Sequence, residues 1–156
     1  MAAETAADIG AVRTLFREYS HAVDSQVLNV CFKGFEDELA RLPGEYGPPA
    51  GRLLLSLDGA EAVGCVGMRP LGDGHCEMKR LYVRPAHRGR GLGRHLAEEI
   101  VRVAAQAGHR RMVLDTFPRA MPEAVALYER LGFRECDPYY PNPAPGVVCY
   151  GLDLAP

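Results

Sequence analysis

Hydrophobic side chains in the first part of the chain recur at intervals of three and four residues, the spacing that places them on one side of an α-helix. This pattern predicts a helix over residues 6 to about 19 and a shorter one over residues 34–42. Residues 51–72 differ, because they form two apolar runs separated by Asp58-Gly59, a dipeptide that favours a tight turn between strands. Residues 74–85 predict a third strand, so the first half should fold as two helices followed by an antiparallel meander.

The second half of the chain alternates helices with strands. An apolar stripe predicts a helix over residues 91–107, which Gly108 ends, and Pro122 opens another helix that Gly132 ends. A meander followed by this alternation predicts one α+β domain with a mixed sheet, spanning residues 1–156. The strands of this half are predicted at residues 110–117, 133–136 and 147–154.

The composition narrows the class of protein. Hydrophobic residues make up 47% of the chain and charged residues 24%, with a formal net charge of −2, which argues against a general nucleic-acid binder. No run approaches the ~20 apolar residues of a membrane span, and the acidic start MAAETAADIG lacks the apolar core of a signal peptide. The five cysteines lack the CxxC spacing of a zinc site. We therefore expect a cytoplasmic protein with reduced cysteines and without a metal, nucleic-acid or membrane partner.

The segment LYVRPAHRGRGLGRHL, residues 81–96, has glycine at the alternate positions 89, 91 and 93. Alternate glycines allow successive backbone N–H groups to point into one cavity, and the helix that follows adds its own unpaired N–H groups and positive end. Arg84, Arg88, Arg90 and Arg94 add positive charge nearby. This combination predicts a site for a phosphate or pyrophosphate group.

Two common phosphate-binding loops fit this segment less well. A dinucleotide fingerprint needs GxGxxG, whereas the spacing here is GxGxG, although Asp115 ends the next strand at roughly the distance expected of the ribose-binding acid. A P-loop needs a lysine and a hydroxyl directly after its last glycine, and the chain has neither there. A nucleotide-binding protein is therefore a distant alternative.

A third pattern fits better. Arg88-Gly89-Arg90-Gly91-Leu92-Gly93 has the form [R/Q]xxGxG, and AVALYERLGF, residues 124–133, is a helix that carries a tyrosine and ends in Gly-Phe. Together, and at this spacing, the two motifs resemble those of the GNAT superfamily of N-acetyltransferases, over most of the chain and most strongly over residues 77–133. The resemblance implies a GNAT-like α+β fold: a mixed, mostly antiparallel central sheet, splayed between two parallel central strands and flanked by about four helices.

The resemblance also implies acetyl-CoA as the cosubstrate. The strand before the loop would pair its main chain with the pantetheine arm, and the loop amides would hold the pyrophosphate. Two positions depart from the family pattern: Met121 replaces an asparagine that touches the cofactor in many members, and the strand that usually opens the fold must fit into residues 1–5. The implied cofactor-binding residues are Leu81, Tyr82, Val83, Arg88, Gly89, Arg90, Gly91, Leu92, Gly93, Arg94 and Tyr128.

Tyr128 matches the motif tyrosine of the superfamily, whose phenol would protonate the departing thiolate. Taken without the resemblance, the same residue would be a core aromatic on an apolar helix face. The attacking amine must also lose a proton, and Glu77 on the central strand is the candidate base, direct or through water, or else the anchor for a substrate ammonium. A water chain takes the place of a dedicated base in many members.

Two further expectations concern Glu77. Strand alternation puts it on one face with Lys79, Leu81 and Val83 unless a bulge resets the parity. The alternative to a chemical role is a salt bridge with Lys79, Arg80 or Arg69.

Other residues are candidates for the acceptor pocket. Tyr139, Tyr140 and Asn142 lie in a proline-rich loop between the last two strands, and Phe32 and Phe35 could line the same pocket, although packing explains them equally well or better. The resulting hypothesis is direct transfer of an acetyl group from acetyl-CoA to a primary amine, and the expected acceptor is a small molecule. A protein N-terminus or lysine remains open as the acceptor, as does a non-catalytic acyl-CoA-binding sensor, and homodimers are common in the superfamily.

Overall fold

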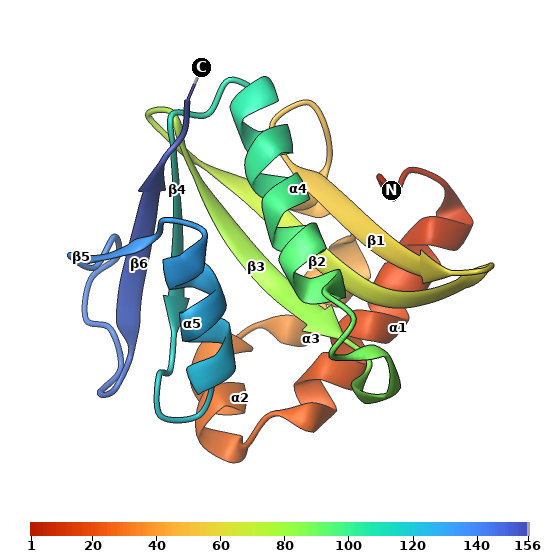
Figure 1. The fold of residues 1–156 in the computed structure, drawn as a ribbon, viewed down its shortest axis with the longest axis horizontal. Helices are drawn as coiled ribbons and strands as arrows, with labels where there is room; N and C mark the ends of the chain where they lie inside the picture. The colour runs from red at the N-terminus through yellow and green to blue at the C-terminus, as the bar shows by residue number, and fades with distance from the viewer. Residues whose placement is uncertain (156) are drawn as a thin grey trace.

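The computed structural model describes residues 1–155, which form one six-stranded sheet with helices on both faces (Figure 1). The strand order is β1-β2-β3-β4-β6-β5, and only β3 and β4 are parallel neighbours. The strands are β1 (Arg52–Asp58), β2 (Glu61–Gly72), β3 (His75–Val83), β4 (Arg111–Thr116), β5 (Arg134–Cys136) and β6 (Val148–Asp153). The helices are α1 (Ala6–Ala22), α2 (Ser25–Cys31), α3 (Phe35–Arg41), α4 (Leu92–Gln106) and α5 (Pro122–Arg130).

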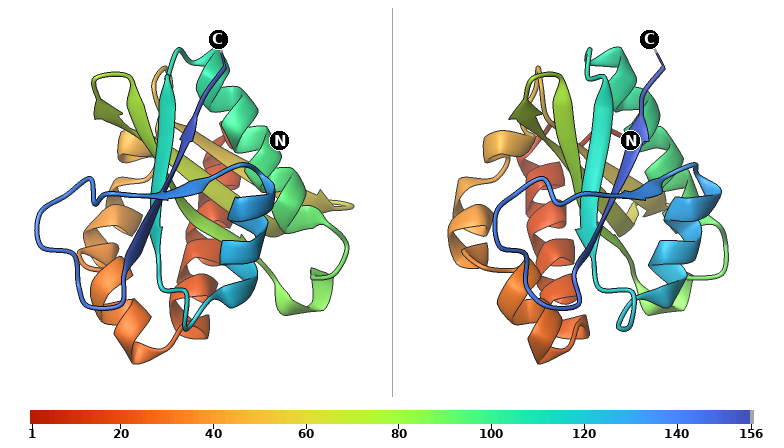
Figure 2. Two further views of the ribbon diagram at one scale, coloured as in Figure 1. Left: turned by 60° about the vertical axis from the view of Figure 1, so that its left-hand side comes forward. Right: turned by 90° about the vertical axis from the view of Figure 1, so that its left-hand side faces the viewer.

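The helices divide between the two faces of the sheet, and each group closes its own hydrophobic core (Figure 2). Helices α1, α2 and α3 cover one face, where Phe16 and Leu39 pack against Leu53 and Leu55 of β1. Helices α4 and α5 cover the other, where Ile100 and other apolar residues meet the opposite side of the same strands. None of the helices among residues 1–155 is long and apolar enough to cross a membrane.

Local sequence signals explain where the two long helices begin. Thr5 caps α1, because its hydroxyl accepts from the amide of Asp8 and the Asp8 carboxylate accepts from the amide of Thr5. Gly91 precedes α4 in a left-handed conformation (φ 79°), which glycine adopts without strain. The amphipathic pattern then carries each helix over the sheet.

The parallel pair in the middle of the sheet is short. Residues 75–77 of β3 pair with residues 111–113 of β4, and beyond that point the two strands are no longer hydrogen-bonded. Figure 1 shows β3 and β4 meeting at one end and diverging toward the other. The structure therefore has the mixed, mostly antiparallel and splayed sheet that the sequence predicts, with five helices rather than about four.

A bulge lies in β3 at the start of the diverging part. Lys79 pairs with Gly67 and Tyr82 with Cys65, so Arg80 and Leu81 together oppose a single residue of β2. Arg80 takes a left-handed conformation (φ 62°), which is strained for a residue with a side chain. The bulge resets the parity of the strand.

The parity change separates residues that simple alternation would have grouped. Leu81 and Val83 pack into the core beneath α4 and α5, whereas Glu77 bonds to Arg69 and Tyr139 away from that core. Tyr82 belongs to the core beneath α1 to α3. The sequence placed Glu77, Lys79, Leu81 and Val83 on one face only if no bulge intervened, and the structure has the alternative, in which a bulge resets the parity.

Two short elements differ from the expectations. The predicted opening strand is reduced to a single bridge, in which Ala2 pairs antiparallel with Leu54 of β1. Helix α2 was not predicted, because its seven residues SQVLNVC are too few to show a helical period. Asp24 caps this helix by accepting from the amide of Val27 at 2.9 Å, and that capping residue was the available signal.

Candidate active site

The glycine loop presents a row of unpaired backbone donors. Among residues 1–155, no acceptor bonds to the amides of residues 89–94, which lead from the loop into the first turn of α4. Gly89 (φ 80°) and Gly91 (φ 79°) are left-handed, and a side chain added at either would enter open space. The row therefore lies at the positive end of α4 and faces outward, as an anion site requires.

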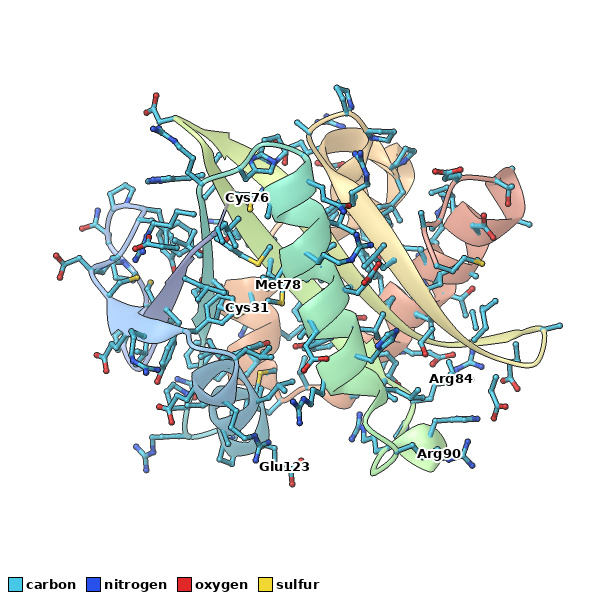
Figure 3. The ribbon with its side chains drawn as sticks, turned by 45° about the horizontal axis from the view of Figure 1, so that its top comes forward. Cys31, Cys76, Met78, Arg84, Arg90 and Glu123 are labelled. Carbon is cyan, nitrogen blue, oxygen red and sulfur yellow. The ribbon has the colours of Figure 1, made fainter. Side chains whose placement is uncertain are left out.

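The arginines around the loop are engaged by protein groups (Figure 3 labels Arg84 and Arg90). Arg84 forms an ion pair of 2.7 Å with Glu18, Arg90 pairs with Asp58 at 3.3 Å, and Arg94 pairs with Glu98 at 2.7 Å. Arg88 donates from Nε to the carbonyl of Val83 at 2.9 Å. The backbone amides, more than the arginine side chains, are thus the groups left available to a ligand.

A cavity of about 580 Å³ extends from this loop along the diverging end of β3. It is bounded by the end of α1, the start of α2, the last residues of β3 and the start of α5. Leu81, Tyr82, Val83 and Arg88, four of the predicted cofactor-binding residues, line it together with Met121, whereas residues 89–94 do not. The remaining lining residues are Tyr19, Ala22, Val23, Asp24, Val27, Ala120, Pro122, Glu123 and Ala124.

A second cavity of about 90 Å³ occupies the gap between β3 and β4. Tyr19, Leu81 and Met121 line both cavities, so the two spaces adjoin. The residues that line the smaller one include Lys79 of β3, Asp115 of β4 and Tyr128 of α5. Val30, Cys31, Phe32, Met78, Arg80, Leu114 and Thr116 complete its wall.

Tyr128 combines a packed ring with a free hydroxyl. The ring lies in the core beneath α4 and α5, edge-on to Phe133 at 5.9 Å. Its hydroxyl has no hydrogen-bond partner within residues 1–155. Burial raises the pKa of this phenol, and Tyr19 and Asp115 add to the effect, so the proton stays in place near neutral pH.

Glu77 is buried and held by two partners. Its Oε1 accepts from Nε of Arg69 at 2.7 Å, and its Oε2 accepts from the hydroxyl of Tyr139. Arg69 also bridges to Glu45 at 2.8 Å, and Glu77 lines neither cavity. The structure therefore forms the salt bridge with Arg69 that was the alternative to a chemical role.

The proline-rich loop approaches the site as expected, although its tyrosines bind carboxylates and do not line a cavity. Tyr139 bonds to Glu77, and Tyr140 donates to Oδ2 of Asp115 at 2.6 Å. The two rings pack edge to face at 5.1 Å. Asn142 is exposed, away from both cavities. The loop thus fixes the acidic residues of β3 and β4 at the point where the strands separate.

The two phenylalanines have different positions. Phe32 lines the smaller cavity, with the guanidinium of Arg80 4.0 Å from its ring centre. Phe35 lies behind it at 5.0 Å between ring centroids and belongs to the core. Packing therefore accounts for Phe35, and Phe32 also reaches the cavity wall.

Sequence reasoning did not place Lys79, Asp115 or Tyr19 in the site, and it named Met121 only as a departure from the family pattern at a cofactor-contacting position. One signal for Lys79 was present, because the chain has only two lysines, Lys33 and Lys79, beside sixteen arginines. Asp115 was considered only as a ribose-binding acid. The other residues become visible only when α1 and the start of α5 come together around β3.

The mixed sheet splays beside a row of unpaired amides, and a tyrosine hydroxyl lies in the gap. This is the architecture of an acyl-CoA-dependent N-acetyltransferase. The model of the acetyltransferase (GNAT) family matches residues 12–133. The chain therefore belongs to the GNAT acetyltransferase family, whose members transfer an acyl group from acyl-CoA.

Relatives and solved structures agree with this assignment. An uncharacterised N-acetyltransferase of Schizosaccharomyces pombe is 41% identical over 150 residues, which is 95% of this chain and 90% of the relative. An acetyltransferase structure from Streptococcus agalactiae superposes with a TM-score of 0.78 at 21% identity, covering 99% of this chain and 96% of that one. The PaiA N-acetyltransferase of Thermoplasma acidophilum, in complex with coenzyme A, has a TM-score of 0.73 at 14% identity, with coverage of 97% and 96%.

Proposed function

We propose that the chain transfers an acetyl group from acetyl-CoA directly to the primary amine of a small molecule. The observation that carries the proposal is the continuity of the site. Arg88, which directly precedes the unpaired amides of residues 89–94, lines the larger cavity, Tyr128 lines the smaller one, and the two cavities share Tyr19, Leu81 and Met121. The Thermoplasma acidophilum protein, which has the same fold, is in complex with coenzyme A and supports the choice of cosubstrate.

The loop and the bulged strand would hold the cofactor. The pyrophosphate would accept hydrogen bonds from the amides of residues 89–94, at the positive end of α4. The pantetheine arm would follow β3 through the larger cavity, beside Leu81, Tyr82 and Val83, where β4 no longer pairs with that strand. This arrangement directs the thioester toward the smaller cavity and Tyr128.

The chemistry requires three events at the thioester. The amine nitrogen forms a bond to the carbonyl carbon, an N–H of the bulged strand stabilises the negative oxygen, and the carbon–sulfur bond breaks. Tyr128 then gives its proton to the departing thiolate, which releases coenzyme A, and the phenolate regains a proton from the nitrogen, which loses it as the amide forms. The proton that the attacking ammonium must lose passes to water in the cavity. Glu77 serves as a positioning residue, since Arg69 and Tyr139 engage both of its oxygens.

The size of the smaller cavity favours a small acceptor over a peptide. A space of about 90 Å³ between β3 and β4 admits a few non-hydrogen atoms, whereas a protein lysine or N-terminus would bring its chain along the mouth of the site. A sensor that binds acyl-CoA without turnover remains the competing function, and it would use the same loop.

Thermal unfolding followed by a turnover assay tests the proposal. Acetyl-CoA or CoA at about 100 times its dissociation constant should add about 2.7 kcal/mol to the stability, a shift of several degrees, whereas NAD and ATP should not. Thiol release from acetyl-CoA should then be faster with a panel of small primary amines than without them. A shift without amine-dependent release would indicate the sensor, and a shift with NAD or ATP alone would refute the acetyltransferase.

A further inference from the structure

Two opposite charges remain open where the sheet splays. Lys79 and Asp115 line the smaller cavity from β3 and β4, and within residues 1–155 neither forms an ion pair, with the other or with any other group. The other charges near the cavity are satisfied, since Glu77 is paired with Arg69 at 2.7 Å and Arg80 with Glu38 at 3.0 Å. The site thus carries one unmatched cation and one unmatched anion.

Asp115 is the unmatched anion, and it lies next to the reaction centre. Tyr140 donates to Oδ2 at 2.6 Å, which fixes the carboxylate, while Oδ1 has no donor within residues 1–155. Asp115 and Tyr128 line the same cavity of about 90 Å³, and the charge of Asp115 contributes to the raised pKa of Tyr128. A cation held by Asp115 would therefore lie beside the phenol that serves the thioester.

Lys79 is the unmatched cation. Burial, followed by the neighbouring charge of Arg80, lowers the pKa of its ammonium, because a partly buried cation without a counter-ion is unfavourable. An anion placed against this ammonium would relieve that cost. The position is also unusual within this chain, because sixteen other basic positions are arginine and the second lysine, Lys33, is exposed.

We propose that the acceptor is a small amino acid, whose ammonium binds Asp115 beside Tyr128 and whose carboxylate binds Lys79. This inference rests on the proposed acetyltransferase function and names its substrate class. The unpaired charges are complementary to a zwitterion, because the carboxylate of Asp115 binds the ammonium of the amino acid and the ammonium of Lys79 binds its carboxylate. An amine and a carboxylate attached to a short carbon skeleton fit a cavity of about 90 Å³.

The two charges have separate tasks in this arrangement. Asp115 positions the amine for attack once it has lost its proton, and the nitrogen forms the new bond to the acetyl carbon as the thiolate leaves. Lys79 holds the carboxylate, which takes no part in the bond changes. A simple amine would satisfy Asp115 and leave Lys79 unpaired, so the carboxylate is what distinguishes the preferred acceptor.

Matched acceptors test the inference. Thiol release from acetyl-CoA is measured with alanine, with alaninamide and with ethylamine, which share a primary amine and differ in the carboxylate. The expected kcat/KM for alanine is about tenfold or more above those for the two compounds without the acid, as for a charge-assisted hydrogen bond. Equal or lower values for alanine would overturn the inference. Further short amino acids, among them glycine, serine and β-alanine, extend the comparison to other carbon skeletons.

Lysine variants link the preference to its residue. Lys79→Met, which keeps the length of the side chain and removes its charge, should bring the ratio of alanine to ethylamine close to one. The Lys33→Met variant, at the exposed lysine, should keep the wild-type ratio. A wild-type ratio in Lys79→Met would overturn the inference, and a thermal scan of each variant shows that it is folded.

A binding measurement separates failure of the inference from failure of the proposed function. If CoA binds but no acceptor accelerates thiol release, calorimetric titration of alanine into the complex with CoA becomes the test. Binding of alanine that Lys79→Met abolishes would retain the amino acid site and reject the transferase. Absence of alanine binding, together with turnover of ethylamine, would retain the transferase and reject the amino acid site.

Discussion

Arg80 and Glu38 form an ion pair of 3.0 Å that joins the bulge of β3 to helix α3, and both side chains are largely buried. The same guanidinium donates to the carbonyl of Cys31 at 2.9 Å and lies over the ring of Phe32 at 4.0 Å. Because Cys31 and Phe32 belong to the wall of the smaller cavity, this one side chain fixes the N-terminal helices against the diverging strand. The strained backbone at Arg80 is thus stabilised by several contacts of its own side chain.

Replacement of Arg80 by methionine should destabilise the protein strongly. The change leaves Glu38 buried with only the hydroxyl of Tyr46 as a donor, and it removes the contact with Phe32 while the left-handed backbone remains strained. Loss of one partner of a buried pair predicts a decrease of about 3 kcal/mol in the free energy of unfolding, measured by urea denaturation. Arg102→Met removes an exposed pair with Glu99 and should leave the free energy of unfolding almost unchanged. Equal effects of the two substitutions on the free energy of unfolding would show that the buried pair does not stabilise the protein more than the exposed one.

Removal of the Tyr128 hydroxyl should affect the chemical step and leave cofactor binding intact. Tyr128→Phe keeps the packing against Phe133, but the departing thiolate loses its proton donor. We expect kcat to fall about a hundredfold and the dissociation constant for CoA to stay within about twofold. Tyr150→Phe is the matched control, because Tyr150 is buried in the same core and lines neither cavity. Unchanged turnover in Tyr128→Phe would remove this residue from the mechanism.

Local signals in the sequence were sufficient for most of the fold and for the anion loop. Gly91 and Gly108 border α4 because both positions are left-handed, and the Asp58-Gly59 turn sets the hairpin of β1 and β2. These features depend on neighbours within a few residues. The tyrosine motif was equally local, so the place of Tyr128 on α5 followed from the sequence.

The partners of the acidic residues could not be predicted in this way. The bulge at Arg80 depends on the register between β2 and β3, which no local pattern encodes. Whether Glu77 or Asp115 is open to a ligand depends on Arg69 and on two tyrosines that arrive from a loop more than twenty residues beyond β4. Sequence patterns thus predicted which segments form the candidate site, while long-range contacts decide which of its charges are free.

A side chain at Gly91 should weaken cofactor binding more than its strain explains. Gly91→Ala places a methyl group in open space at φ 79°, beside the amides that the pyrophosphate would occupy. The left-handed backbone should cost about 1 kcal/mol of stability, and the dissociation constant for CoA should rise about tenfold. Gly108→Ala at φ 91° also adds a methyl group in open space, but at the far end of α4, and so should lower stability without changing CoA binding. Equal dissociation constants in the two variants, measured by calorimetry, would argue against the loop as the pyrophosphate site.

The half-buried thiol of Cys31 should make the protein less stable in alkali. Burial, followed by the charge of Asp115, raises the pKa of this thiol from 9.0 to about 11. The folded chain therefore keeps a proton that the unfolded chain releases, so the contribution of the thiol to stability is fully present below about pH 9 and is lost as the pH rises toward about 11. Burial raises the pKa of Tyr19 from 10.0 to about 12, which extends the loss to higher pH.

Comparison of Cys31→Ser with the wild type isolates this effect, because serine keeps the approximate size of the side chain and does not titrate in this range. The free energy of unfolding, measured in urea with a reductant at about pH 8 and again at about pH 10.5, should fall less in the variant than in the wild type. Any difference in packing shifts both values of the variant equally and cancels from the comparison. Parallel decreases in the two proteins would mean that Cys31 titrates alike in the folded and unfolded chains, and therefore that water reaches the thiol through the open end of the cavity.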